Sequence, residues 1–456
     1  MGCDEASYEI LREKYNPSWG PGEKTFQLQY AILIGARSLT QLLIDKGANV
    51  NAEGGLYGNA LQAACERGHL EIVQLLIEKE ANVNAEGGKY GNALQAASCW
   101  GHLETVQLLI EKGANVNAEG GEYGNALQAA CYGGHLESVQ LLIVKGANVN
   151  AEGGEYGNAL QAACCWGHLE TVQLLIEKGA NVNAEGGQYA NALQAACSGG
   201  HLEIVRLLVE KGANVNAEGS LFGNALQVAC SRGDLVIVQL LIEKGANVNA
   251  EGGLYGNALQ VACSRKYLEI VQLLIEKGAN VNAESGLYGN ALQAACCWGH
   301  LETVQLLIEK GANVNAEGGQ YGNALQAACF GGCLEIVQLL IEKGANVNAE
   351  GGEYGNALQA AISLPLWVSH KNQSGVVQLL VQNGVNVNAK GGPHGNVVRA
   401  AQVKGLQDIL QFLMTNGADK NLLHDNSDQS EEGFTSYSGS VYSEDTEFTT
   451  ANVALE

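Results

Sequence analysis

A period of 33 residues runs through most of the chain and limits the folds that are open to it. The stretch NAEGGLYGNALQAAC, residues 51–65, returns in nearly the same form nine more times. Its first asparagine falls at Asn51, Asn84, Asn117, Asn150, Asn183, Asn216, Asn249, Asn282, Asn315 and Asn348. A unit of this length cannot bury its own apolar surface and has to stack on its neighbours, so the sequence predicts a solenoid.

Each unit carries the signals of two short helices. In the first full unit, Asn59 is a favourable cap for a helix through NALQAAC, and Gln62 is placed to return a hydrogen bond to the N–H of this cap. Gly68 ends that helix, and HLEIVQLLIEK follows with apolar residues at helical spacing. The other second helices are followed by a glycine suited to a helix end, whereas the first full unit has Glu80 there. Two adjacent glycines then predict a tight turn in an extended finger.

The repeat array is predicted to span residues 26–421, about twelve units. Its ends, residues 26–51 and 396–421, fit the frame only loosely, as expected for units that cap an exposed core. Residues 363–375 carry an insertion between the two helices of one unit, where Pro365 predicts a surface loop. An unspliced intron is the alternative origin of this insertion.

The segments outside the array differ from it in composition. Residues 1–25 are a polar N-terminal segment without an apolar run of signal-peptide length. Residues 422–456 are acidic, rich in Ser and Thr, and free of Lys and Arg, so they are predicted to be disordered.

The charge and the lack of targeting signals restrict the partners of the chain. A formal net charge of −23 disfavours binding to nucleic acid or to an anionic membrane surface. No stretch of the sequence is long and apolar enough to span a membrane. The thirteen cysteines are therefore predicted to be reduced thiols in a cytoplasmic protein, which we expect to be monomeric.

The repeating unit resembles the ankyrin repeat. The match lies in GHLEIVQLLIEKGANVNA, which resembles the second helix and the base of the finger, whereas NALQ replaces the usual Thr-Pro-Leu-His opening of the first helix. The variant GGxYGNALQAA is similar to ankyrin arrays of filamentous-fungal proteins, which often follow the NTPase module of NLR-like receptors. The resemblance implies an all-α solenoid of about twelve helix-turn-helix units with protruding β-hairpin-like fingers.

The same resemblance implies a function. It suggests a non-catalytic scaffold that binds a partner protein in the concave groove of the array. One alternative is the ligand-sensing half of an NLR-like receptor whose NTPase domain is missing from this chain, and another is a passive spacer.

Histidines and cysteines recur at fixed positions of the repeat, which raises the possibility of metal sites or disulfides. The distance between repeats argues against both. One histidine per repeat opens the second helix at His69, His102, His135, His168, His201 and His300. Neighbouring helices lie about 10 Å apart, so these rings cannot converge on one metal ion, and the matching cysteines cannot pair as disulfides. We predict structural histidines and buried thiols, with no metal, cofactor or catalytic site.

The few positions that vary between repeats are the candidates for partner recognition. They lie at the finger before the constant tyrosine and at the end of the first helix. The candidate residues are Trp100, Tyr132, Trp166, Leu221, Arg232, Leu254, Arg265, Leu287, Trp298, Phe330, Glu122 and Glu155. Aromatic residues and arginine are typical of binding hot spots. The alternative is that the aromatics only cover helix ends and that the variation is drift, and the constant tyrosines are predicted to pack between fingers.

Overall fold

The computed structural model describes residues 24–54, 57–219, 223–364 and 369–423. It divides into two compact units, Met1–Gln320 and Tyr321–Glu456, which are described separately below. The polar segment 1–25, except its last two residues, and nearly all of the acidic tail 422–456 lie outside the described residues.

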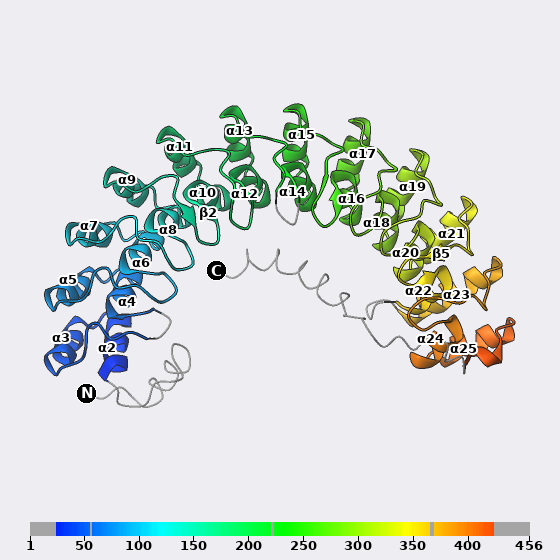
Figure 1. Cartoon of the computed structure of the whole chain (residues 1–456), viewed down its shortest axis with the longest axis horizontal. Helices are drawn as coiled ribbons and strands as arrows, with labels where there is room; N and C mark the ends of the chain where they lie inside the picture. The colour runs from blue at the N-terminus through cyan, green and yellow to red at the C-terminus, as the bar shows by residue number, and fades with distance from the viewer. Residues whose placement is uncertain (1–23, 55–56, 220–222, 365–368, 424–456) are drawn as a thin grey trace. The chain divides into compact units, whose positions relative to one another are not determined.

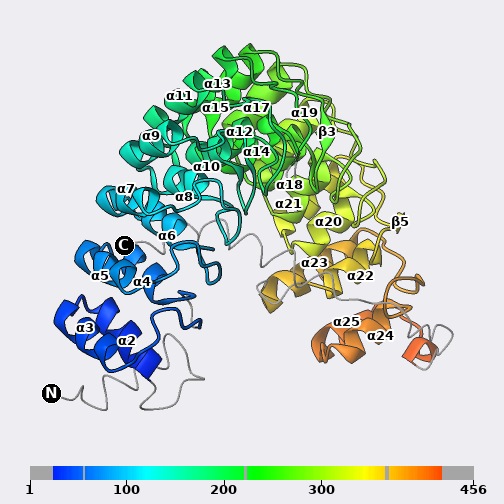
Figure 2. The same cartoon turned by 60° about the vertical axis from the view of Figure 1, so that its left-hand side comes forward.

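Pairs of short helices build the first unit (Figures 1 and 2). The first helices of the repeats form an inner row, and the second helices form an outer row on the other side of the stack (Figure 1). The inner row is α2 (Lys24–Leu33), α4 (Ala60–Glu66), α6 (Ala93–Cys99), α8 (Ala126–Gly133), α10 (Ala159–Trp166), α12 (Ala192–Gly199), α14 (Ala225–Arg232), α16 (Ala258–Ser264) and α18 (Ala291–Cys297). The outer row is α3 (Arg37–Asp45), α5 (Leu70–Glu78), α7 (Leu103–Glu111), α9 (Leu136–Val144), α11 (Leu169–Glu177), α13 (Leu202–Glu210), α15 (Leu235–Glu243), α17 (Leu268–Glu276) and α19 (Leu301–Glu309).

Three more helix pairs form the second unit. They are α20 (Ala324–Phe330) with α21 (Leu334–Glu342), α22 (Ala357–Ile362) with α23 (His370–Gln382), and α24 (Val397–Val403) with α25 (Gln407–Thr415), followed by the 3-10 turn η1 (Lys420–Leu423). The described residues thus hold twelve helix pairs, and the predicted all-α solenoid of about twelve units is confirmed.

The fingers are the segments between one second helix and the next first helix, for example residues 114–124. Three of them contain two-residue antiparallel strands: β1 (Glu152–Gly153) with β2 (Gly157–Asn158), β3 (Glu251–Gly252) with β4 (Gly256–Asn257), and β5 (Glu350–Gly351) with β6 (Gly355–Asn356). The register joins Glu152 to Asn158 in the first pair, so each hairpin is closed by the cap of the following helix.

The inner helices can pack closely because their side chains are small. Ala63, Ala64 and Cys65 are fully buried, and the same positions are buried in the following repeats up to α22. Leu76 and Val73 of the outer helix complete the core of the repeat. The core is therefore continuous along each stack rather than centred in one repeat.

From α4 to α24, the first helix of each repeat begins at an asparagine whose side chain caps it, as predicted. The Oδ1 atom of Asn59 accepts a hydrogen bond from the backbone N–H of Gln62 at 2.9 Å. The predicted return bond from Gln62 is wrong, because its Oε1 accepts no hydrogen bond from the cap. Its Nε2 instead donates to the carbonyls of Ala85 and Gly91 in the next finger at 3.2 and 3.4 Å. The amide of Gln62 thus links its own helix to the next finger, where the carbonyl of Gly91 also accepts from the N–H of Gly87 at 2.8 Å.

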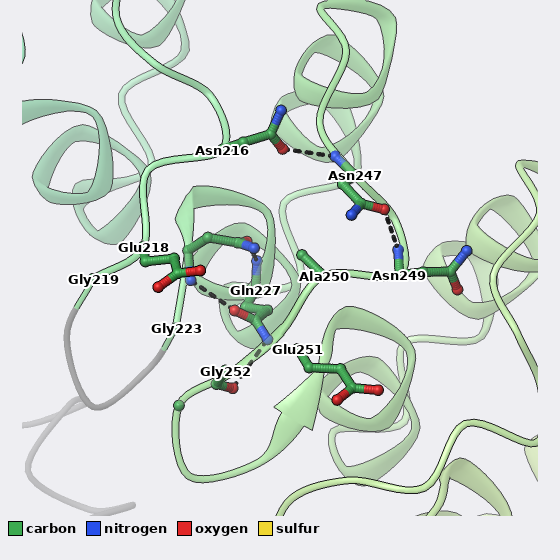
Figure 3. Close-up of a pocket in the computed structure, with 12 residues that line it drawn as sticks. Asn216, Glu218, Gly219, Gly223, Gln227, Asn247, Asn249, Ala250, Glu251 and Gly252 are labelled. Carbon is green, nitrogen blue, oxygen red and sulfur yellow. Dashed lines mark hydrogen bonds between the residues drawn. The ribbon is translucent and has the colours of Figure 1, made fainter.

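A full capping box occurs in two repeats of the described chain, at α14 and α16. In α14 the N–H of Asn224 donates to Oε1 of Gln227 at 2.6 Å, while Nε2 of Gln227 donates to the carbonyls of Gly252 and Gly256. Figure 3 shows this glutamine between its own cap and the next finger. The two roles are compatible because the amide has one accepting and one donating end.

The repeated NVNAE sequence forms a ladder of side-chain bridges between repeats. The Oδ1 atom of Asn117 accepts from the N–H of Asn148 at 2.8 Å, and its Nδ2 donates to the carbonyl of Gly146 at 3.0 Å. Within the next repeat, the N–H of Asn150 donates to Oδ1 of Asn148. Figure 3 shows the same arrangement at Asn216, with Asn247 and Asn249 as its continuation. The strict period of this asparagine thus reflects a structural link between repeats.

The insertion near 363–375 is only partly a loop. Residues 370–375 belong to α23, which begins at His370 after the cap Ser369. Gln373 is buried, and its Nε2 donates to the carbonyls of Ala361 and Ile362, so this extra turn closes the end of α22. The predicted loop is therefore wrong for this part, while Pro365 lies outside the described residues.

Replacing Glu80 with glycine is expected to raise the free energy of unfolding by about 1 kcal/mol. Glu80 has a φ of 65°, in the left-handed region, where Gly113 of the next repeat has a φ of 88°. A side chain is disfavoured in this conformation, and nothing lies within 4 Å of a Cβ at Gly113 that could compensate. Urea denaturation followed by circular dichroism measures the change. Gln74→Gly, at an exposed position inside α5, should instead destabilise, and a lower stability of Glu80→Gly would contradict the argument.

Candidate protein-binding surface

The variable finger positions of the first unit lie on a hydrogen-bonded backbone row. The N–H of Glu122 donates to the carbonyl of Lys89, that of Glu155 to Glu122, and that of Gln188 to Glu155, at 3.0 to 3.1 Å. The same link joins Leu287 to Leu254 at 3.0 Å. Side chains at these positions are therefore held in a fixed order on neighbouring fingers.

The constant tyrosines pack between the fingers, as predicted. The rings of Tyr90 and Tyr123 stack with centroids 6.0 Å apart, and those of Tyr156 and Tyr189 with centroids 6.4 Å apart. Tyr123 is buried, so most of this ladder is hidden behind the variable residues.

Three of the predicted residues belong to one connected group of rings, which we call the aromatic patch: Trp100, Tyr132 and Trp166. The indole N–H of Trp100 donates to the hydroxyl of Tyr90 at 2.9 Å, and Tyr90 stacks on Tyr123. Tyr132 lies 4.7 Å from Tyr123 and 4.9 Å from Trp166, measured between ring centroids. Trp100 is 48% exposed, and Tyr132 and Trp166 are half-buried. Nearby packing thus positions a rigid aromatic surface that remains accessible.

Two exposed carboxylates flank the aromatic patch. Glu122 forms an ion pair with Lys89, with Nζ 3.5 Å from Oε2, while no Lys or Arg of the described chain forms an ion pair with Glu155. Burial and the neighbouring Glu122 raise the pKa of Glu155. The charge next to the patch is therefore negative and incompletely compensated.

In the described part of the chain, the other predicted residues of the first unit do not form one connected group of rings. Leu221 lies outside the described residues, and Leu254 and Leu287 are half-buried on adjacent fingers. Trp298 is half-buried, and its indole N–H donates to the hydroxyl of Tyr288 at 2.9 Å. Arg265 is also half-buried.

Arg232 has a structural task that the sequence did not reveal. Its Nη1 donates to the carbonyl of Ser198 in the preceding repeat at 2.6 Å. In other repeats a histidine makes the equivalent contact, and here the histidine position is Asp234. Arg232 therefore replaces the missing histidine, although its side chain remains exposed.

Phe330 is a packing residue rather than a surface residue. It belongs to the second unit and is 6% exposed. Its ring lies 5.2 Å from that of Tyr321 and 5.0 Å from that of Tyr354. This burial argues against the predicted role of Phe330 in partner contact, because its ring is already covered on both sides.

The histidine ladder links consecutive repeats. Nε2 of His102 lies 2.9 Å from the carbonyl oxygen of Glu66, and Nε2 of His135 lies 3.0 Å from that of Cys99. A carbonyl only accepts, so Nε2 carries the proton in this pair. Burial lowers the pKa of His135, which favours the neutral ring. The structural role predicted for these histidines fits this geometry, and the described residues contain no group of three or more potential ligands placed to hold a metal ion.

The twelve cysteines of the described residues are free thiols, and ten of them are buried. Burial raises the pKa of the Cys131 thiol well above its usual range and that of Cys99 to about 11. Cys99 and Cys297, at the last residue of their helices, are buried as well, and Cys165 is half-buried. These thiols are held in their unreactive, protonated form.

A polar cavity of about 640 Å³ lies between two fingers of the first unit (Figure 3). Its walls include Asn216, Asn247 and Gln227, whose side chains are already engaged in the ladder and the capping box. The polar groups of this cavity therefore serve the links between repeats, and we assign no ligand to it.

Stacked helix pairs with hydrogen-bonded fingers at this period define a repeat protein of the ankyrin class. The model of the ankyrin-repeat family (three copies) matches residues 28–120, 119–186, 185–252, 219–285, 259–351 and 317–391. The chain therefore belongs to the ankyrin-repeat family. Ankyrin repeats generally mediate protein–protein interaction.

Among solved structures, the chain is similar to the human ASB11 ankyrin repeat domain. The two are 27% identical, the match covers 48% of this chain and 98% of that chain, and the TM-score is 0.42. Comparison with curated proteins found no match. No helix in the described part of the chain is long and apolar enough to cross a membrane.

Proposed function

We propose that this protein is a non-catalytic scaffold that recognises a partner protein through the aromatic patch of its first unit. The observation that carries the proposal is the exposure of Trp100 on a row of rings that the fingers hold in place. An apolar ring of this size left in water contributes to binding when a partner covers it. Its neighbours Tyr132 and Trp166 extend the same surface across two more repeats.

The composition of the surface supports protein recognition rather than chemistry. Hot spots at protein interfaces are enriched in Trp, Tyr and Arg and are surrounded by polar residues. Glu122 and Glu155 provide such a polar border. Leu254, Leu287 and Trp298 form a second candidate contact further along the same unit.

Replacing Trp100 and Trp166 with alanine is expected to weaken capture of the partner by about 30-fold, the equivalent of one strong hot spot. The measurement compares quantitative capture by the wild-type chain and the variant from a lysate of the source cells. Val144→Ala is the matched control, because Val144 is 80% exposed on the outer helix α9. Circular dichroism confirms that each variant remains folded.

The outcome also separates the two alternative functions. Equal capture by the double variant and by wild type would overturn the proposed surface. Specific capture of a small molecule rather than a protein would favour the sensing half of a receptor. A chain that captures nothing specific would favour the passive spacer.

A further inference from the structure

The finger of Lys89 shows how this surface holds a positive charge. The ammonium of Lys89 lies 5.8 Å from the ring centroid of Tyr90 and 3.5 Å from the carboxylate of Glu122 in the next finger. A cation is stabilised by the face of an aromatic ring and by an adjacent carboxylate at once. Two neighbouring fingers thus bring a cation, a ring and a carboxylate together.

The next repeat has the same ring and carboxylate but a different first residue. Glu122 takes the position of Lys89, Tyr123 that of Tyr90, and Glu155 that of Glu122, with the same backbone link between the fingers. Lys89 and Glu122, on one pair of neighbouring fingers, carry opposite charges. Glu122 and Glu155, on the next pair of fingers, are both carboxylates. No Lys or Arg of the described chain forms an ion pair with Glu155.

The aromatic patch lies beside these carboxylates. Tyr132 contacts both Tyr123 and Tyr156, the tyrosines that follow Glu122 and Glu155, at centroid distances of 4.7 and 5.5 Å. A planar guanidinium can stack on such rings and pair with a carboxylate at the same time. The net charge of −23 adds a long-range attraction for a basic partner.

We propose that the surface formed by Glu122, Glu155, Tyr132 and Trp100 binds a basic segment of a partner protein and takes up an arginine side chain beside Glu155. This inference rests on the proposed function, because it names the chemistry of the partner for the same surface. The partner's guanidinium forms an ion pair with Glu155, as the ammonium of Lys89 does with Glu122. A neutral or acidic segment lacks the charge that this pair of carboxylates requires.

The test uses the full chain and a fluorescent Gly-Ser peptide that carries arginines, measured by fluorescence anisotropy. A peptide with citrulline in place of arginine has the same shape without the charge. Binding of the arginine peptide is expected to exceed that of the citrulline peptide by about ten-fold and to weaken with added salt. Equal binding of the two peptides, or no binding at about 1 mM, would overturn the proposal.

The sharpest variant is Glu122→Lys, which recreates the arrangement of the preceding repeat. The new ammonium is expected to lie over Tyr123 and to pair with Glu155, and so to lower affinity for the arginine peptide by about ten-fold or more. Glu170→Lys, at an exposed position of the outer helix α11, changes the net charge equally and should preserve most of the binding. An equal loss of affinity for the arginine peptide in both variants would mean that binding rests on general electrostatic attraction, and it would contradict a defined site.

Capture of the natural partner distinguishes this inference from the proposed function. If Trp100→Ala weakens capture but Glu122→Lys does not, the aromatic surface binds a partner, and the inference that the bound segment is basic is wrong. If neither variant changes capture, the surface itself is wrong. Loss of capture in both variants, with retention in Glu170→Lys, supports both proposals.

Discussion

Replacing Gly121 with alanine is expected to lower the free energy of unfolding by about 3 kcal/mol. Gly121 has a φ of 66°, and a Cβ there would overlap the backbone of Tyr90 and Gly91 in the preceding finger. The left-handed conformation costs a side chain about 1 to 2 kcal/mol, and a clash with backbone adds a similar amount because the backbone cannot move aside.

Gly113→Ala is the matched control for this effect. Gly113 also has a left-handed φ, of 88°, but nothing lies within 4 Å of a Cβ at that position. We expect a loss of about 1 kcal/mol there, from conformation alone. Urea denaturation measures both variants, and hydrogen exchange at the finger amides locates the change. Equal losses at Gly121 and Gly113 would show that the close approach of the fingers contributes nothing.

Replacing Gln128 with leucine is expected to lower the free energy of unfolding by about 2 to 3 kcal/mol. The Nε2 group of Gln128 donates to the carbonyls of Ala151, Gly153 and Gly157 in the next finger, at 3.2 to 3.3 Å. Gln128 is 1% exposed, so water cannot replace this donor without opening the contact between repeats. Leucine keeps a similar volume and leaves these carbonyls without the amide.

Gln107→Leu provides the comparison for this second effect. Gln107 is exposed on α7 and donates only to Glu111 of the same helix. Its replacement should change stability by less than about 0.5 kcal/mol. The two variants are compared by thermal and urea denaturation. A Gln128→Leu variant as stable as Gln107→Leu would show that the buried amide does not hold the fingers together.

Part of the candidate site could be predicted from the sequence. The place of Trp100, Trp166 and Trp298 at the end of a first helix is visible in the sequence, but Trp100 is exposed while the other two are half-buried. Phe330 lies one position earlier in the repeat, at the position of Tyr132, and it is buried between the rings of Tyr321 and Tyr354 whereas Tyr132 is half-buried. The sequence ranks both residues equally, since the neighbours that separate them lie on other fingers.

The task of Arg232 shows the same limit. The loss of a histidine at Asp234 is visible in the sequence, but its replacement by an arginine two residues earlier is not. The contact is made to Ser198, 34 residues away in the chain. Knowledge of which carbonyl the histidines reach would have been needed to find it.

The sequence by itself determined the repeating unit, its two helices and their caps, because these depend on residues within one or two turns of each other. The period also determined that the units stack, since none can bury its apolar face alone. Only the tertiary structure decided the bonds between units. Gln62 donates to a finger 23 residues ahead, and His102 contacts a carbonyl 36 residues behind. These partners are chosen by the distance between stacked repeats, and so is the exposed surface that remains for a partner protein.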